Sequence, residues 1–525
     1  MLNSVKRSLV FSEFTEKEQN YWFSIKEKAV SHHIDTLYYS VFIDGDMVDP
    51  TPDTYTGESL LGFLEDMTML KQRVQLDPVA KIQYYGLDVE RSGAAIGGGL
   101  YAFHLSLKDH YDIFISPYIP TDKTPRIQVQ IRTNSLVLDG LYEALHKSFD
   151  KVCSILSHYG LAVSDVRENR IDYAFHTNVV QKPAEVFSDE NLKKHLDTTF
   201  RELYKHVWLT GKRDDFFDLD YFSLGSRRSN NVFFRVYNKT KEVVQMNYKG
   251  FFFEVWFERG LISRYDLYVM KEAYTRNSYK TGVSVGRINW YLEYGKNKDL
   301  KAELRKLLES CDLKSDNNPF MEKKIKGVLP PITTIMNFEF ETKRKFYVDM
   351  DLSNTKVRRF ASEPIPYYKR PELYRLYVLF EERRAIFNVL LRERVVFRED
   401  NFDISSPMLD FWARIARCKV GQIDYDRKAV WEYSRNLDME KTKRRLCNSL
   451  AQLSMLKKNS VNPSELGDDI WLAASLLNDN DIENYQSEAR KVFGNMSSKK
   501  YAGIRQRKAR QLRSYIKNSG DDSED

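Results

Sequence analysis

The most informative part of the sequence reads RIQVQIRT (126–133), DGLYEALHKSFDKVCSILSHYG (139–160) and NRIDYAFHTN (169–178). The first and third segments carry β-branched and aromatic residues in partial alternation, which predicts strands. The middle segment places apolar residues at helical spacing and ends at Gly160, which predicts a helix over residues 138–160. A strand, a long helix and a second strand resemble half of a split βαβ unit, so this pattern favours an α+β fold.

Other segments extend the pattern towards both ends of the chain. Similar strand signals occur at residues 35–44, 101–107, 112–119, 231–239 and 261–270. We therefore expect residues 1–295 to form an α+β catalytic domain, with a mainly antiparallel sheet and packed helices.

The chain changes character after residue 295. Residues 296–352 contain DNNP, a Pro-Pro pair and a short strand-like stretch, and we expect a linker with a strand excursion. Residues 353–525 turn helical and hold 33 Lys and Arg against 25 Asp and Glu, whereas residues 1–352 hold 48 against 49. This asymmetry favours a mostly α-helical, basic C-terminal domain that binds DNA or serves as an accessory domain. Its end contributes four candidate DNA-binding residues, Arg505, Arg507, Lys508 and Arg510.

The composition argues against several protein classes. The sequence has no run of about 18 apolar residues, so a transmembrane helix and a membrane partner are not expected. The N-terminus lacks the apolar core of a signal peptide. The four cysteines form no CxxC pair, so a structural zinc site and a disulfide framework are not expected either. We expect a cytoplasmic protein.

The segment NVFFRVYNKTKE (231–242) carries the strongest chemical signal. Arg235, Tyr237 and Lys239 share one face of an extended strand. Two cations beside a tyrosine favour its phenolate form and also bind a phosphate. The alternative is an ordinary strand with an edge tyrosine and snorkelling cations. A turn-rich segment just upstream offers further groups to a DNA backbone, namely Ser226, Arg227 and Ser229.

Two more predicted strands present acidic residues. Arg170, Asp172 and His176 share one face of the strand at 169–178, and an acid with an imidazole is able to help hold a divalent metal. The strand predicted at 261–270 presents a single carboxylate, that of Asp266. The alternative for the strand at 169–178 is a solvated sheet face.

The order of these segments resembles the replication initiation factor family, which comprises rolling-circle plasmid initiators and related conjugative-element relaxases with a single catalytic tyrosine. In that family, a strand with an Arg-hydrophobic-Asp signature is followed by a turn with glycine, serine and arginine. The strand with the nucleophilic tyrosine comes next, and a later segment carries an acid. The matching residues here are Arg170-Ile171-Asp172, Leu224-Gly225-Ser226-Arg227, Arg235-Val236-Tyr237-Asn238-Lys239 with Glu242, and Arg264-Tyr265-Asp266.

The resemblance implies a metal-dependent, site-specific endonuclease and strand transferase. Tyr237 would attack one strand of a DNA origin, which would give a covalent phosphotyrosine and a free 3′-hydroxyl primer. The strand would later be rejoined. Arg235 and Lys239 would stabilise the charge that develops on the phosphate. The proton of the phenol would pass to His176 or to a metal-bound hydroxide, and the sequence leaves both open.

The same resemblance implies a cofactor, Mg²⁺ or Mn²⁺, held by Asp172 and Asp266. Glu254 and Glu258 lie close to Asp266 in the sequence and compete with it for the second ligand position. The implied partners are double-stranded and single-stranded origin DNA, a host helicase and polymerase, and a second copy of the chain in a homodimer.

Other readings of the sequence are weaker. Neither a His-hydrophobe-His pair nor a Walker A loop occurs, which argues against a histidine-paired nickase and a helicase. A tyrosine recombinase needs a histidine box before its tyrosine that is also absent. A conjugative relaxase with the same chemistry and a non-catalytic origin-binding protein stay open as alternatives.

Overall fold

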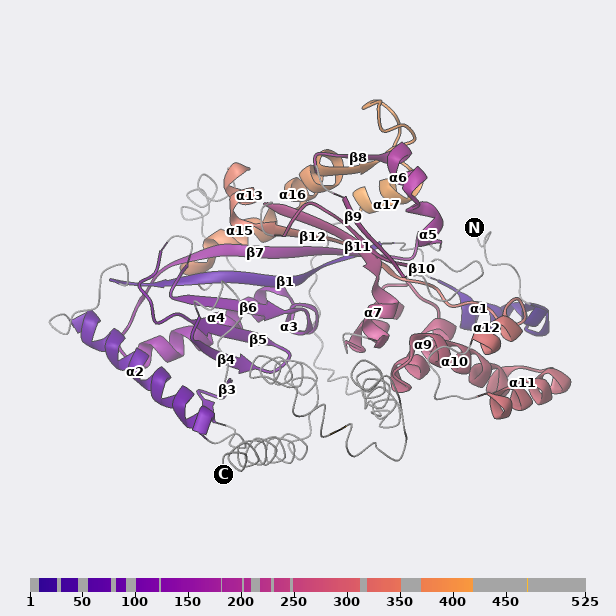
Figure 1. Ribbon diagram of the computed structural model, residues 1–525, viewed down its shortest axis with the longest axis horizontal. Coiled ribbons are helices and arrows are strands. Elements are labelled where there is room, and N and C mark those ends of the chain that lie inside the picture. The colour runs from indigo at the N-terminus through magenta and orange to yellow at the C-terminus, as the bar shows by residue number, and fades with distance from the viewer. Residues whose placement is uncertain are drawn as a thin grey trace, which may run out of the picture.

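The computed structural model describes residues 9–25, 30–45, 55–76, 82–90, 101–121, 124–180, 182–200, 203–208, 218–227, 231–245, 249–311, 319–350, 370–418 and residue 470. Within these residues, eleven strands form one sheet in the order β2-β3-β4-β5-β6-β1-β7-β12-β11-β10-β9 (Figure 1). Every neighbouring pair in it is antiparallel. The α+β prediction with a mainly antiparallel sheet is confirmed.

The strands of this sheet are β1 (Val30–Ile43), β2 (Gln83–Tyr84), β3 (Leu87–Val89), β4 (Phe103–Leu107), β5 (Tyr111–Ile115), β6 (Ile127–Arg132), β7 (Val163–Thr177), β9 (Leu203–Trp208), β10 (Asp218–Leu224), β11 (Val232–Asn238) and β12 (Met336–Lys343). A separate two-stranded sheet joins β8 (Leu196–Thr198) to β13 (Val395–Phe397).

The helices before β12 are η1 (Leu9–Glu13), α1 (Glu16–Phe23), α2 (Tyr55–Leu76), α3 (Thr133–Leu138), α4 (Leu141–His158), α5 (Pro183–Val186), α6 (Asp189–His195), α7 (Lys239–Gln245), α8 (Phe251–Glu258), α9 (Arg264–Thr275), α10 (Tyr279–Tyr294), α11 (Lys298–Ser310) and α12 (Pro319–Ile325). After β12 come α13 (Arg344–Asp349), η3 (Pro371–Leu373), α15 (Tyr374–Glu381), α16 (Arg383–Val389), η4 (Leu390–Arg394) and α17 (Asp410–Ala416). None of the helices in the described part of the chain is long and apolar enough to span a membrane.

One face of the central strands is apolar and packs against helices. Ile171, Tyr173 and Phe175 alternate along β7 and are fully buried. The ring of Phe387 in α16 contacts Phe175, and the ring of Trp412 in α17 contacts those on β11 and β12. Figure 1 shows α16 and α17 on one side of these strands and α7 on the other. The main core therefore lies between this face and its helices, because burying apolar surface is the dominant stabilising term.

The strand expected after residue 336 is present, but it is part of the main sheet and not an excursion from it. It forms β12, which pairs with β7 on one side and with β11 on the other. Its side chains are almost all buried. Of the stretch expected to be a linker, residues 298–310 and 319–325 form α11 and α12. The turn signals around Pro330–Pro331 favoured a linker, but strand pairing across about a hundred residues is not readable from local turn chemistry.

The strand predicted at residues 261–270 is also wrong, because α9 begins at Arg264. Ser263 is the N-cap of this helix, and its hydroxyl accepts a hydrogen bond from the backbone of Asp266 while the Asp266 carboxylate accepts one from Ser263. This reciprocal pair is a capping box, a helix-start signal that outweighs the partial alternation of the following residues.

The helical prediction for the C-terminal portion is confirmed over residues 370–418, where α15, α16 and α17 form. These helices pack on the same core as the sheet. The basic stretch with Arg505, Arg507, Lys508 and Arg510 lies outside the described residues, so its role in DNA binding stays a prediction.

Candidate active site

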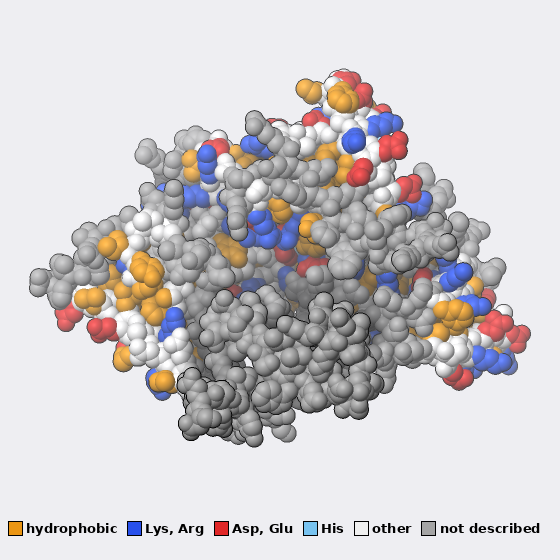
Figure 2. Space-filling model, viewed as in Figure 1, with side chains coloured by type: hydrophobic (Ala, Val, Ile, Leu, Met, Phe, Trp, Pro, Cys, Tyr) orange, Lys and Arg blue, Asp and Glu red, His pale blue; other side chains and the backbone are white. Residues whose placement is uncertain are grey.

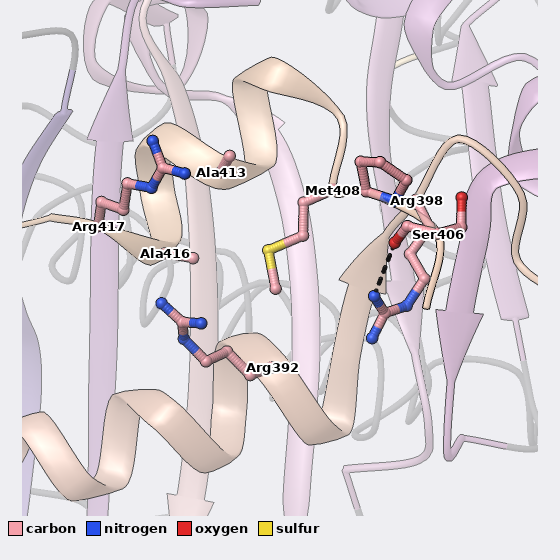
Figure 3. A pocket seen from close by; sticks show the side chains of 8 residues that line it. Arg392, Arg398, Ser406, Met408, Ala413, Ala416 and Arg417 are labelled. Atoms are coloured by element: carbon pink, nitrogen blue, oxygen red, sulfur yellow. Dashed lines mark hydrogen bonds between the residues drawn. The ribbon is translucent and has the colours of Figure 1, made fainter. Parts of the chain in front are cut away.

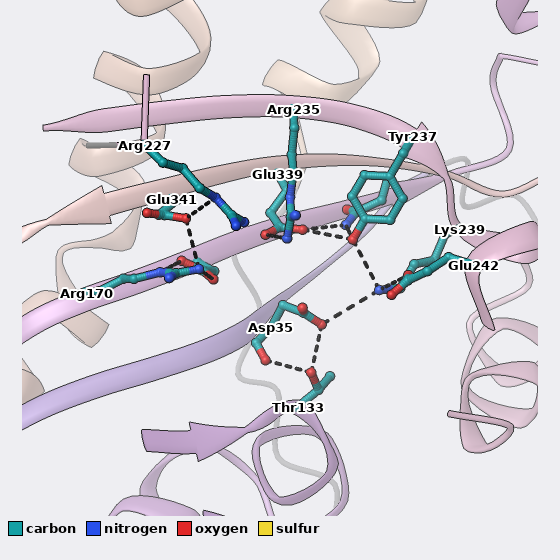
Figure 4. A network of polar contacts seen from close by, with 12 residues as sticks. Asp35, Thr133, Arg170, Arg227, Arg235, Tyr237, Lys239, Glu242, Glu339 and Glu341 are labelled. Atoms are coloured by element: carbon teal, nitrogen blue, oxygen red, sulfur yellow. Dashed lines mark hydrogen bonds and ion pairs between the residues drawn. The ribbon is translucent and has the colours of Figure 1, made fainter. Parts of the chain in front are cut away.

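The hydroxyl of Tyr237 lies at the centre of a polar network on the second face of the sheet (Figure 4). It donates a hydrogen bond to Oε2 of Glu339 at 2.9 Å. It accepts one from Nδ2 of Asn337 at 2.7 Å and one from Nζ of Lys239 at 3.3 Å. Tyr237 itself is half-buried. Its hydroxyl therefore has an acid-base partner and two donors, and its ring keeps some access to solvent.

The strand register explains why these groups meet. Tyr237 is directly opposite Asn337 across the β11–β12 pair, and Arg235 is opposite Glu339. Because side chains two residues apart on a strand share a face, all four point to the same side. Arg235 donates to Oε1 of Glu339 at 2.5 Å, and its guanidinium lies 5.2 Å from the centre of the Tyr237 ring.

Lys239 reaches the same network from a helix instead of a strand. It is the first residue of α7, which starts directly after β11, and its ammonium turns back to the Tyr237 hydroxyl. Its Nζ lies 2.7 Å from Oε2 of Glu242 and 3.9 Å from Oδ1 of Asp35. The predicted grouping of Arg235, Tyr237 and Lys239 is thus present, although Lys239 is fully buried.

Asp35, on β1, ties this network to the neighbouring α3. The hydroxyl of Thr133 donates to Oδ1 of Asp35 at 2.8 Å. Lys249 donates to that hydroxyl at 2.6 Å and lies 3.6 Å from the same Asp35 oxygen. Asp35 therefore faces two ammonium groups, those of Lys239 and Lys249.

The phenolate expected from the flanking cations is not favoured here. Burial raises the pKa of Tyr237 well above its usual value, and Glu242 and Glu339 raise it further against the opposite effect of Lys239 and Arg235. Burial opposes ionisation of Glu339, yet Arg235 and Lys239 hold its pKa below the usual value. The network therefore pairs a protonated phenol with a charged carboxylate that accepts its hydrogen bond.

A second cluster lies on the same face, further along β12. Arg170 binds both carboxylate oxygens of Asp172, at 2.8 and 2.6 Å, and reaches Oε2 of Glu341 at 2.9 Å. Arg227 lies 3.1 Å from the same Glu341 oxygen, and its guanidinium is over the ring of Phe233. Arg227 is half-exposed, so this cluster carries a cation to the surface. In Figure 2, Lys and Arg side chains gather near the middle of the view with Asp and Glu beside them.

His176 does not contact the tyrosine. Its Nδ1 accepts a hydrogen bond from the indole of Trp256 at 2.9 Å, and its ring centre lies 4.2 Å from that of His33. Its Nε2 has no hydrogen-bond partner among the described residues. Burial lowers the pKa of His176 well below its usual value. The group that accepts the Tyr237 hydrogen bond is Glu339, so Glu339 is better placed than His176 to act as a base.

The two predicted metal ligands are engaged in other contacts. Both oxygens of Asp172 are taken by Arg170. The Asp266 carboxylate accepts hydrogen bonds from the backbone and hydroxyl of Ser263 and from those of Thr333. The competitor Glu254 is paired with Lys271. No three His, Cys, Asp or Glu side chains of the described chain are grouped as a metal site. Asp172, Asp266 and His176 therefore do not form a joint ligand set for Mg²⁺ or Mn²⁺.

The structure describes only some of the DNA-binding residues predicted in the turn before β11. Ser226 and Arg227 follow β10, at the turn that leads towards β11. Ser229 lies outside the described residues. Several residues of the network carried no signal in the sequence patterns considered above, namely Asp35, Thr133, Lys249, Asn337 and Glu339. The alternation Asn-Phe-Glu-Phe-Glu at 337–341 was the available signal, because it places three polar residues on one strand face.

No protein-family model matches this sequence, and no curated protein matches it. Among solved structures, the chain is similar to the rolling circle replication initiator protein from Geobacillus stearothermophilus. The TM-score is 0.33 and the sequence identity 9%, over 75% of this chain and 99% of that one.

Proposed function

We propose that this protein is a rolling-circle replication initiator that nicks one strand of its DNA origin through Tyr237 and later rejoins it. The observation that carries the proposal is the arrangement around the Tyr237 hydroxyl. A carboxylate accepts its hydrogen bond, and an amide and an ammonium donate to its oxygen. These contacts support the proposal because a nucleophilic hydroxyl needs a positioned base in contact with it.

The chemical step is a transfer of a phosphoryl group to the tyrosine. The phenol oxygen attacks phosphorus, so a bond between Tyr237 and phosphorus forms while the bond from phosphorus to the 3′ oxygen breaks. The phenol proton goes to Glu339, and the departing 3′ oxygen takes a proton from water. The products are a 5′-phosphotyrosine and a free 3′-hydroxyl. The reverse reaction reseals the strand without ATP, because the ester bond is conserved in the intermediate.

Arg235 and Lys239 are proposed to stabilise the phosphate during this step. The Nε of Arg235 is buried and has no hydrogen-bond partner among the described residues, so it keeps a donor for a phosphate oxygen. Although burial alone would lower it, Asp35 and Glu242 hold the pKa of Lys239 well above its usual value, so the ammonium stays charged. Fixed cations in a water-poor site stabilise developing negative charge strongly.

A divalent cation, Mg²⁺ or Mn²⁺, remains part of the proposal, but no step above passes through it. Asp172 and Asp266 do not meet, so they are not proposed as its joint ligands. Cleavage should be assayed in EDTA and again after Mn²⁺ is added back. Loss followed by recovery would support a metal cofactor, whereas unchanged cleavage in EDTA would remove it from the mechanism.

The nucleophile is tested with supercoiled plasmid that carries the gene for this chain and its flanking DNA. The wild-type protein should give a relaxed plasmid with protein attached through phosphotyrosine. Tyr237→Phe should fold normally and give no adduct, because it lacks only the attacking oxygen. The matched control is Tyr221→Phe, since Tyr221 lies directly opposite Tyr237 on β10 and is exposed.

Three outcomes would count against the proposal. Wild-type nicking by Tyr237→Phe would mean that another residue attacks. Loss of nicking in Tyr221→Phe alone would indicate that Tyr221 on β10 is the nucleophile. Tight origin binding without any cleavage by the wild-type chain would favour the non-catalytic origin-binding protein. A conjugative relaxase would perform the same chemistry, and the replicative or transferred form of the nicked DNA would distinguish it.

A further inference from the structure

A pocket apart from the Tyr237 network is lined by arginines (Figure 3). It has a volume of about 370 Å³ and is formed by η4, the start of the segment after β13, and α17. Arg392, Arg398 and Arg417 line it, together with Ser406 and the apolar side chain of Met408. None of its lining residues is acidic.

The pocket and the tyrosine network are on opposite faces of the sheet. Trp412, one turn before the end of α17, packs against Phe234 and Phe338. Those two residues alternate with Arg235 and Glu339, which point to the other side. A ligand in this pocket therefore cannot be the phosphate that Tyr237 attacks.

The three arginines are only partly neutralised. Arg398 is held by Asp197 at 3.3 Å and donates to the backbone oxygen of Ser406 at 3.0 Å. The exposed side chains of Arg392 and Arg417 make no hydrogen bond or ion pair with any described residue. In Figure 3, Arg392 reaches into the space between η4 and α17. Arg392 and Arg417 are therefore the cations of this pocket that have no acidic partner among the described residues, whereas Arg398 already has Asp197.

Ser406 contributes to the pocket wall through its backbone, whose oxygen accepts the hydrogen bond from Arg398 (Figure 3). It is 8% exposed, and its hydroxyl is turned away from the arginines and accepts a hydrogen bond from the backbone of Asp400 at 3.0 Å. Guanidinium groups match the oxygens of a phosphate because each offers two parallel donors.

We propose that this pocket binds the phosphate of a nucleotide, with Arg392 and Arg417 as the cations that bind the phosphate and Met408 beside the sugar or base. The volume suits a small ligand with one apolar and one charged part. The ligand is either a free nucleotide or one nucleotide of a single strand, because both present the same chemistry. The proposal does not depend on the role of Tyr237.

The test uses the full chain with Tyr237→Phe, so that no probe is cleaved. Equilibrium dialysis measures binding of dTMP against thymidine, and fluorescence anisotropy measures binding of a labelled oligothymidylate. The double variant Arg392→Gln with Arg417→Gln should weaken the binding of the phosphate-bearing probe by about tenfold or more, because it removes two charge-assisted hydrogen bonds to the phosphate. The matched control is Arg414→Gln, because Arg414 is an exposed arginine of α17 that is paired with Asp410.

The probes distinguish the two sources. If dTMP binds, thymidine does not and the double variant loses dTMP, the ligand is a free nucleotide. If only the oligothymidylate binds and the double variant weakens it, the ligand is a strand. Equal affinities in the double variant and in Arg414→Gln would overturn the proposal. So would the absence of binding of both phosphate-bearing probes to the parent chain.

Discussion

The two faces of the central strands are built from opposite chemistry. On the apolar face, Phe175, Phe338 and Phe234 pack against α16 and α17. On the polar face of the same strands, Asp172 and Glu339 are held by arginines. Apolar burial stabilises a fold in proportion to area, whereas a buried ion pair about breaks even with a hydrophobic pair. We infer that the apolar face supplies the stability and the polar face the chemistry.

The two faces are expected to differ most in the effect that a substitution has on the nicking rate. Glu339→Gln keeps the shape of the side chain but removes the proton acceptor of Tyr237, so single-turnover nicking should fall by about 10²–10⁴-fold. DNA binding should be kept. The control is Glu341→Gln, two residues along the same strand face and without a contact to Tyr237. Equal rates for Glu339→Gln and the wild type would show that the polar face holds no base at this position.

A change on the apolar face should have the opposite outcome. Trp412 is fully buried against β11 and β12, so Trp412→Ala should lower the free energy of unfolding by about 3–5 kcal/mol. Denaturant unfolding measures this. The nicking rate per folded molecule should stay near the wild-type value at low temperature. A specific loss of nicking without loss of stability would mean that the two faces are not separate in function.

The pH dependence of stability sharpens the comparison. Burial raises the pKa of Asp172 to about 7 despite its contact with Arg170, so the folded protein holds a proton that the unfolded chain releases. Stability should therefore fall as the pH rises from about 4 to about 7, at about 1.4 kcal/mol per pH unit while the group titrates. Asp172→Asn should lack this component, whereas Asp165→Asn on the same strand should keep it. Parallel pH profiles for the wild type and Asp172→Asn would contradict the assignment.

The smallest expected effect concerns Asp266, which lies on neither face. Its carboxylate caps α9 and accepts four hydrogen bonds. Asp266→Ala should therefore destabilise the fold by about 1–3 kcal/mol, because it leaves buried donors without a partner. The wild-type Mn²⁺ affinity should be retained. Unchanged stability with weakened Mn²⁺ binding would restore Asp266 as a metal ligand.

Much of the strand architecture was predictable because it depends on local alternation. The face shared by Arg170, Asp172 and His176 and the one shared by Arg235 and Tyr237 follow from the two-residue period of a strand, and both are present. The roles of these residues in cleavage stay predictions. The error at Asp266 was avoidable, since Ser263 and Asp266 have the spacing of a capping box.

No local sequence pattern predicts which strands β12 pairs with. Its Asn337 and Glu339 meet Tyr237 only because β12 pairs between β7 and β11, more than 90 residues away from β11 in the chain. Sequence periodicity reports which side chains share a face within one segment, because it reflects the geometry of neighbouring peptides. Which segments lie side by side depends on the packing of the whole core. The chain itself therefore specified the tyrosine and its flanking cations, and the tertiary structure supplied the carboxylate that accepts its hydrogen bond.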